Sequence, residues 1–149
     1  IKHDVQNLTF EEFNHLDQQF RSAVSAKLHW QERSYLKREL KERSSEDLLL
    51  CGLMWPCGYT REHAINSIET RHDLLILKAL LLRLNDWTYT VYQAAFRRAQ
   101  VLLESTEHTE LIELIPYFTR LIQCDRHCSL DDLKQLAFII LNKVLVIKK

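Results

Sequence analysis

Residues 71–84 constrain the fold most, because apolar side chains fill the run from Leu74 to Leu84 apart from Lys78 and Arg83. In a helix these side chains would cover every face, and a helix of that kind is buried among other elements. A buried strand can also be continuously apolar. The length of the run, its leucine-rich composition and its lack of flanking glycines favour the helix. The sequence therefore predicts a central, buried helix over residues 71–84.

The rest of the chain predicts further helices of the amphipathic type. Phe13, Leu16, Phe20 and Val24 recur at the spacing of one helical face. The same kind of pattern predicts helices over 45–55, 61–69, 88–104, 107–123 and 130–147.

Composition agrees with a helical fold, since two glycines and two prolines in 149 residues leave little material for turns. Pro116 lies inside the predicted helix 107–123 and is expected to kink or divide that helix. We expect one all-α domain over residues 1–149, excised from a larger protein. It is predicted to be a compact bundle, or a stack like that of HEAT repeats, of about six to eight helices around helix 71–84.

Helix starts are marked by short polar motifs. Thr9 and Glu12 have the spacing of a capping box, in which each side chain accepts a hydrogen bond from the other residue's backbone N–H. The pairs Ser44–Asp47 and Ser129–Asp132 repeat this spacing, and single caps are predicted at Thr60, Thr70 and Thr88.

The stretch CGLMWPCGY, residues 51–59, holds both glycines of the chain. It is predicted to be a corner between two helices, in which Pro56 ends the first helix and Gly58 turns the chain with a positive φ. We expect Gly52 to permit close helix packing, and Trp55 and Tyr59 to anchor the corner in the core.

A metal site is the alternative interpretation of the cysteines in this corner and in the later CDRHC stretch. Their spacing matches neither a redox pair nor a zinc framework, so we expect reduced thiols in an intracellular protein of the cytoplasm or nucleus. Two Glu-x-x-His pairs resemble half of a di-iron motif but lie at predicted helix ends. We expect no bound metal and no cofactor. The residues concerned are Cys51, Cys57, Cys124 and Cys128, with the pairs Glu12–His15 and Glu69–His72.

No enzyme motif is present in the sequence: there is no glycine-rich phosphate loop, no His-Glu-x-x-His and no nucleophile elbow. No apolar run approaches the length of about 20 residues that a membrane span requires. We therefore expect a non-enzymatic domain without a membrane span.

The main functional expectation is a protein–protein interaction domain, a scaffold or adaptor that binds a partner helix or peptide within a multiprotein complex. One helix cannot bury all the apolar residues at the end of the chain, and an acidic series precedes them. The predicted partner-binding residues are Val144, Val146, Ile147, Glu107, Glu110 and Glu113.

Nucleic-acid binding is the alternative function. Residues 27–43 contain six basic and three acidic residues with interleaved aromatic side chains, a composition that can contact phosphates and bases. The zero net charge of the whole chain speaks against it, and a solvated helix face explains the same pattern. The candidate contacts are Lys27, Arg33, Lys37, Arg38, Lys41 and Arg43.

Overall fold

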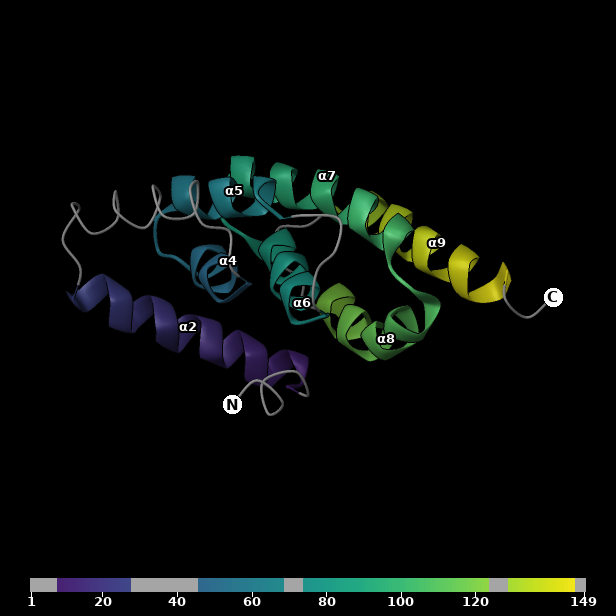
Figure 1. The fold of residues 1–149 in the computed structure, drawn as a ribbon, viewed down its shortest axis with the longest axis horizontal. Helices are drawn as coiled ribbons and strands as arrows, with labels where there is room; N and C mark the ends of the chain where they lie inside the picture. The colour runs from purple at the N-terminus through teal and green to yellow at the C-terminus, as the bar shows by residue number, and fades with distance from the viewer. Residues whose placement is uncertain (1–7, 28–45, 69–73, 124–128, 147–149) are drawn as a thin grey trace.

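The computed structural model describes residues 8–27, 46–68, 74–123 and 129–146 of the 149-residue chain. These residues form seven α-helices and one 3-10 helix, with no strand among them, so the all-α prediction is confirmed (Figure 1). In chain order the elements are α2 (Phe10–Lys27), α4 (Glu46–Leu53), α5 (Gly58–Asn66), α6 (Leu74–Leu82), η1 (Arg83–Asn85), α7 (Tyr89–Ser105), α8 (His108–Gln123) and α9 (Leu130–Val146).

Helix α6 is the centre of the bundle, as its apolar sequence predicts. Every residue from Leu75 to Leu82 is buried, and Leu77, Leu80 and Leu81 have no exposed surface. It packs against α4, α7 and α8, which cover different sides of it. Because the helix is apolar all round, it has no solvent face, and neighbouring helices are required on every side.

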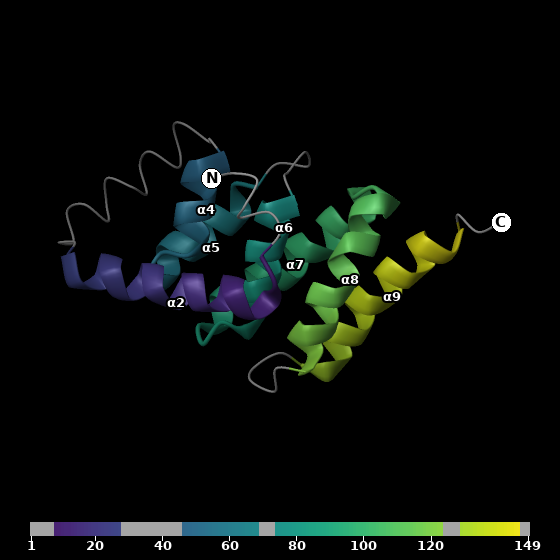
Figure 2. The same ribbon diagram turned by 90° about the horizontal axis from the view of Figure 1, so that it is seen from below.

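The other helices pack around α6 as a compact bundle. Helix α7 contacts α5, α6, η1 and α9, and thus connects the two halves of the molecule. Helices α8 and α9 pack side by side, and α2 and α9 lie at opposite ends (Figure 2). A surface on α2 is therefore far from a surface on α9. Within the described ranges, no helix has the length and hydropathy that crossing a bilayer requires.

The capping box at the start of α2 forms as predicted. The Thr9 N–H donates to Glu12 Oε2 at 2.9 Å, and the Glu12 N–H donates to Thr9 Oγ1 at 3.3 Å. Thr88 precedes α7 as expected, but its side chain caps nothing; its N–H instead donates to Asp86 Oδ1 at 2.9 Å. Asp132, proposed as a capping partner of Ser129, accepts a hydrogen bond from the Tyr92 hydroxyl of α7. The predicted starts at Ser44 and Thr70 lie outside the described residues.

Residues 51–59 do form a corner, between α4 and α5, but three details of its prediction are wrong. Helix α5 begins at Gly58, so Thr60 lies inside the first turn and Cys57 takes the N-cap position. Gly58 does not have a positive φ, because it is already helical. Tyr59 points to solvent and is 78% exposed, whereas Trp55 is buried as expected.

Gly58 permits a close approach between elements, and the expectation for Gly52 stays a prediction. A Cβ at this position would lie 3.2 Å from Thr88 Oγ1, next to the start of α7. Helix α8 continues through Pro116 without being divided, and the proline lies on its exposed side.

Candidate functional site

The predicted C-terminal surface divides between core and solvent. Val144 packs against the hydrophobic core and is half-buried, whereas Val146 is 69% exposed. Ile147 lies outside the described residues. The apolar end of the chain therefore contributes to the fold through Val144 and leaves Val146 on the surface.

A larger apolar surface lies on the outer side of α9. Phe138, Leu141 and Leu145 are 65%, 51% and 56% exposed, and they follow one another at intervals of three and four residues. That spacing places them in one stripe along the helix. We call Phe138, Leu141 and Leu145 the α9 stripe.

The residues of the α9 stripe were not among the partner-binding residues predicted from the sequence, which at this end were Val144, Val146 and Ile147. The core side is formed by Leu133, Leu136 and Ile140, which are buried. Since α9 packs against α7 and α8 at one end of the bundle, no described helix covers its outer side. An apolar pattern identifies helical faces, but the number of neighbours decides which faces are covered.

The acidic residues proposed for partner binding do not all belong to one helix. Glu107 lies between α7 and α8 and is exposed, while Glu110 is in the first turn of α8, where a negative charge stabilises the helix dipole. Glu113 is exposed on α8, and its negative charge interacts electrostatically with Lys78 of α6. Burial lowers the pKa of the Lys78 ammonium, and the charge of Glu113 partly offsets that effect. Part of the acidic series thus compensates a buried amine of the same chain.

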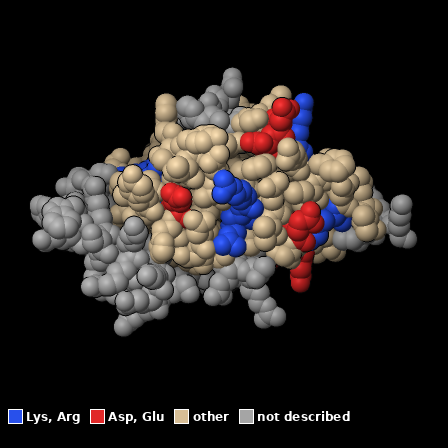
Figure 3. Space-filling model, turned by 90° about the horizontal axis from the view of Figure 1, so that it is seen from above, with Lys and Arg blue, Asp and Glu red and all other residues tan. Residues whose placement is uncertain are grey.

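The basic segment proposed for nucleic-acid binding is almost entirely beyond the described residues. Lys27 ends α2, and the other five candidates, Arg33, Lys37, Arg38, Lys41 and Arg43, are not described. The face formed by α5, α7 and α9 is largely uncharged, with basic and acidic residues in small separate groups (Figure 3). Nucleic-acid binding through residues 27–43 stays a prediction.

Two of the four cysteines lie within the described residues and two lie outside them. Cys51 in the last turn of α4 and Cys57 before α5 are half-buried thiols, and Cys124 and Cys128 lie outside the described residues. Within the described ranges, His, Cys, Asp and Glu side chains form no group of three that could hold a metal ion. Glu12 is occupied in the capping box of α2, and the Glu69–His72 pair is not described.

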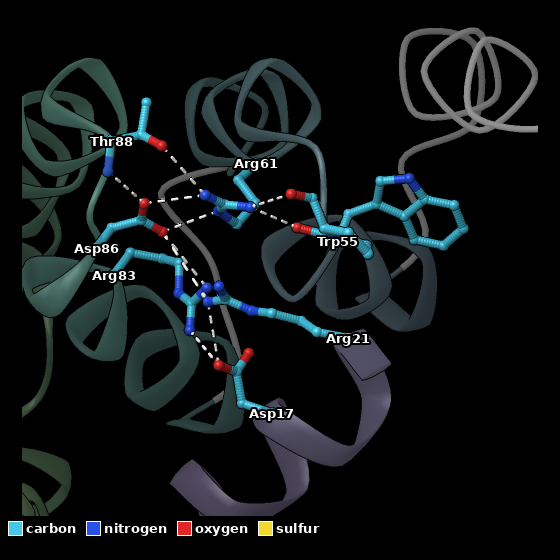
Figure 4. Close-up of polar contacts among 8 residues, drawn as sticks. Asp17, Arg21, Trp55, Arg61, Arg83, Asp86 and Thr88 are labelled. Carbon is cyan, nitrogen blue, oxygen red and sulfur yellow. Dashed lines mark hydrogen bonds and ion pairs between the residues drawn. The ribbon is translucent and has the colours of Figure 1, made fainter. Parts of the chain in front are cut away.

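Sequence reasoning missed a cluster of charged residues inside the bundle. We call Asp17, Arg21, Arg61, Arg83 and Asp86 the buried ionic cluster; all but Arg21 are buried (Figure 4). These residues come from α2, α5, η1 and the segment before α7, so the cluster joins elements that are distant in sequence.

Arg61 makes the most complete set of contacts in the cluster. Its Nε and Nη2 donate to the two carboxylate oxygens of Asp86 at 2.8 and 2.9 Å. Its Nη1 donates to the backbone carbonyls of Trp55 and Pro56, both at 2.8 Å. Arg61 therefore holds the corner after α4 against the start of α7.

The second half of the cluster links η1 to α2. Arg83 Nη2 donates to Asp17 Oδ2 at 2.7 Å, and Arg21 Nη2 lies 3.1 Å from the same oxygen. Burial raises the pKa of the Asp17 carboxyl, and the neighbouring Arg83 opposes this change. Four buried polar atoms next to these contacts have no hydrogen-bond partner: Asp17 Oδ1, Arg21 Nε, Arg83 Nε and Asn85 Oδ1.

One sequence signal could have indicated the cluster. Arg83 directly follows a helix that is apolar on all faces, and a charged side chain at a buried position requires a partner of opposite charge. The partners could not be named from sequence, since Asp17 precedes Arg83 by 66 residues.

The exposed stripe and the buried cluster have different chemical properties. The stripe can bind another apolar surface, whereas the cluster supplies charge and hydrogen bonds in a partly dry environment. No protein-family model, curated protein or solved structure matches the chain. Its function is therefore inferred from its own residues.

Proposed function

We propose that this chain is a non-enzymatic protein-interaction domain in which the α9 stripe binds an amphipathic helix of a partner protein. The observation that supports it most is the exposure of Phe138, Leu141 and Leu145 on one side of α9. Soluble monomers rarely leave large contiguous apolar surface in water, and such surface marks interaction sites.

The shape of the surface favours a helix as the occupant. The α9 stripe runs from Phe138 to Leu145. At about 1.5 Å per residue it extends over roughly 10 Å, which is about two helical turns. A narrow stripe with intervals of three and four residues is what one partner helix contacts when its side chains interdigitate with it.

The role of an adaptor or scaffold within an intracellular complex belongs to the same proposal. It is supported by a buried core whose described helices leave the outer side of α9 uncovered, and by half-buried thiols in the corner before α5.

Site-specific photo-crosslinking tests the proposal. A benzophenone amino acid replaces Phe138 in one variant and Tyr59 of α5 in a matched control, because both are exposed aromatic residues. After irradiation in cells, we expect position 138 to form a covalent adduct with one segment of another protein, whose apolar residues recur every three or four positions.

The control position should give only weak, scattered adducts. Adducts at position 138 that are no stronger or more specific than those at position 59 would contradict the proposal. An adduct with a second copy of this chain would contradict the proposed binding of a different protein and would indicate a homodimer.

A further inference from the structure

The buried ionic cluster adjoins a cavity of about 350 Å³ between α2 and the segment that follows α6. Residues of the cluster form part of its wall, and polar side chains, an exposed tryptophan and the apolar Phe10 and Leu82 form the rest. The polar and aromatic side chains of the wall include Asn14, Asp17, Gln18, Arg21, Arg83 and Trp87. The cavity is lined by residues of α2. Helices α2 and α9 lie at opposite ends of the bundle (Figure 1).

The charges of the cluster do not balance. Three guanidinium groups face two carboxylates, which leaves one positive charge in excess among the described residues. Arg61 is bound to both oxygens of Asp86, and Arg83 to Asp17, so each carboxylate already has an arginine of its own. Arg21 is the third, and it shares Asp17 at 3.1 Å and lies 4.0 Å from Asp86.

Arg21 is also the member of the cluster that solvent reaches. Its side chain is 27% exposed, against 6% or less for the other four charged side chains, and it lines the cavity. Its Nε has no hydrogen-bond partner, and the same is true of Arg83 Nε deeper in the wall. The excess positive charge is thus on Arg21, at the wall of the cavity, whereas the Nε atoms of Arg21 and Arg83 are themselves buried.

Buried charges are stable when they are paired and their hydrogen-bonding groups are used, and among the described residues three guanidinium groups share only two carboxylates. From these contacts we propose that the cavity binds a carboxylate, which Arg21 recognises with its planar guanidinium. The proposal is independent of the α9 stripe and concerns a separate site.

The properties of the wall favour a carboxylate over other anions. A single negative charge neutralises the cluster, whereas a phosphate dianion would be repelled by Asp17 and Asp86. A planar guanidinium pairs with a planar carboxylate through two parallel hydrogen bonds. The volume lies within the range of small-molecule sites and exceeds what a halide ion needs. The Asn14 and Gln18 amides and the Trp87 ring are placed to contact the neutral part of the ligand.

Binding can be measured by NMR on the 15N-labelled chain in chloride-free buffer, with the Trp87 indole and the arginine Nε signals as reporters. Benzoate is the probe, benzamide is its neutral counterpart of the same shape, and acetate and inorganic phosphate test the charge. We expect saturable shifts with benzoate and acetate, and at least about tenfold weaker binding of benzamide and phosphate.

Arg21→Gln is expected to weaken benzoate binding about tenfold or more while the far-UV spectrum is unchanged, because Arg21 is partly exposed. The matched control is Arg97→Gln, which removes the same charge from an exposed position on α7 and should leave binding unaltered. If Arg21→Gln does not fold, the comparison of benzoate with benzamide on the unaltered chain decides.

Two further probes distinguish the source of the carboxylate. N-acetylglutamate amide represents an acidic side chain within a peptide, and lactate, which carries a single carboxylate, represents a free metabolite. Binding of either supports the proposal and identifies the source. Equal binding of benzoate and benzamide, no saturable shift with any carboxylate, or unchanged affinity in folded Arg21→Gln would overturn it.

Discussion

Replacing Arg61 by methionine tests whether the buried ionic cluster holds the bundle together. Methionine keeps an unbranched side chain of similar length but removes all the donors of the guanidinium. The change breaks two hydrogen bonds to Asp86 and two to the carbonyls of Trp55 and Pro56. Asp86 and both carbonyls would then lack their strongest donor at buried or partly buried positions.

The size of the effect follows from these contacts. Removing one partner of a buried ion pair costs about 3–5 kcal/mol, because the remaining charge stays buried without compensation. Asp86 keeps the Thr88 N–H at 2.9 Å and Arg83 at 3.5 Å, which favours the lower part of that range. We expect a loss of about 3–4 kcal/mol in the free energy of unfolding, a large fraction of the roughly 5–15 kcal/mol that a domain possesses.

Urea denaturation followed by circular dichroism measures the loss. Arg97→Met is the matched control, since Arg97 is exposed on α7, and it should change stability by no more than about 0.5 kcal/mol. Asp86→Asn should cost less in the Arg61→Met background than in the wild type, because the two residues share one interaction. A loss below about 1 kcal/mol for Arg61→Met, or strictly additive effects of the two replacements, would refute this account of the cluster.

Three further changes test other parts of the fold. Leu80→Ala removes a fully buried side chain from the centre of α6 and should cost about 2–5 kcal/mol by urea denaturation; a cost near zero would contradict the central position of this helix. Thr9→Ala should lower stability by about 1 kcal/mol through loss of the α2 capping box, whereas Glu12→Gln, which keeps an acceptor, should have a smaller effect. A backbone hydrogen bond, and then Arg120, lower the pKa of Glu11 from its usual 4.5, so its stabilising effect is present above that pH and is lost as the pH falls through the lower folded value. The difference in free energy of unfolding between wild type and Glu11→Gln, measured from about pH 6 to about pH 3, should therefore shrink on acidification. A constant difference would show that the Glu11–Arg120 pair does not contribute to stability.

Local pattern was sufficient to predict the helices and the central one among them. A run such as Leu74–Leu84 cannot satisfy its apolar side chains except in the middle of a bundle, so its position follows from composition alone. The capping box at Thr9 and Glu12 was equally readable, because it depends on residues three positions apart. Turn geometry was less accessible: Gly58 looked like a turn residue and is instead the first residue of α5.

The two candidate sites depend on packing between distant segments. Leu141 and Leu145 have the same local pattern as core residues, and they are exposed because no described helix lies beyond α9 at that end of the bundle. Arg83 and Asp17 meet only when α2 folds against the end of α6, across 66 residues of chain. Hydrophobic period and capping motifs act within a few residues, whereas charge pairing and surface exposure are set by which neighbours the completed fold brings together.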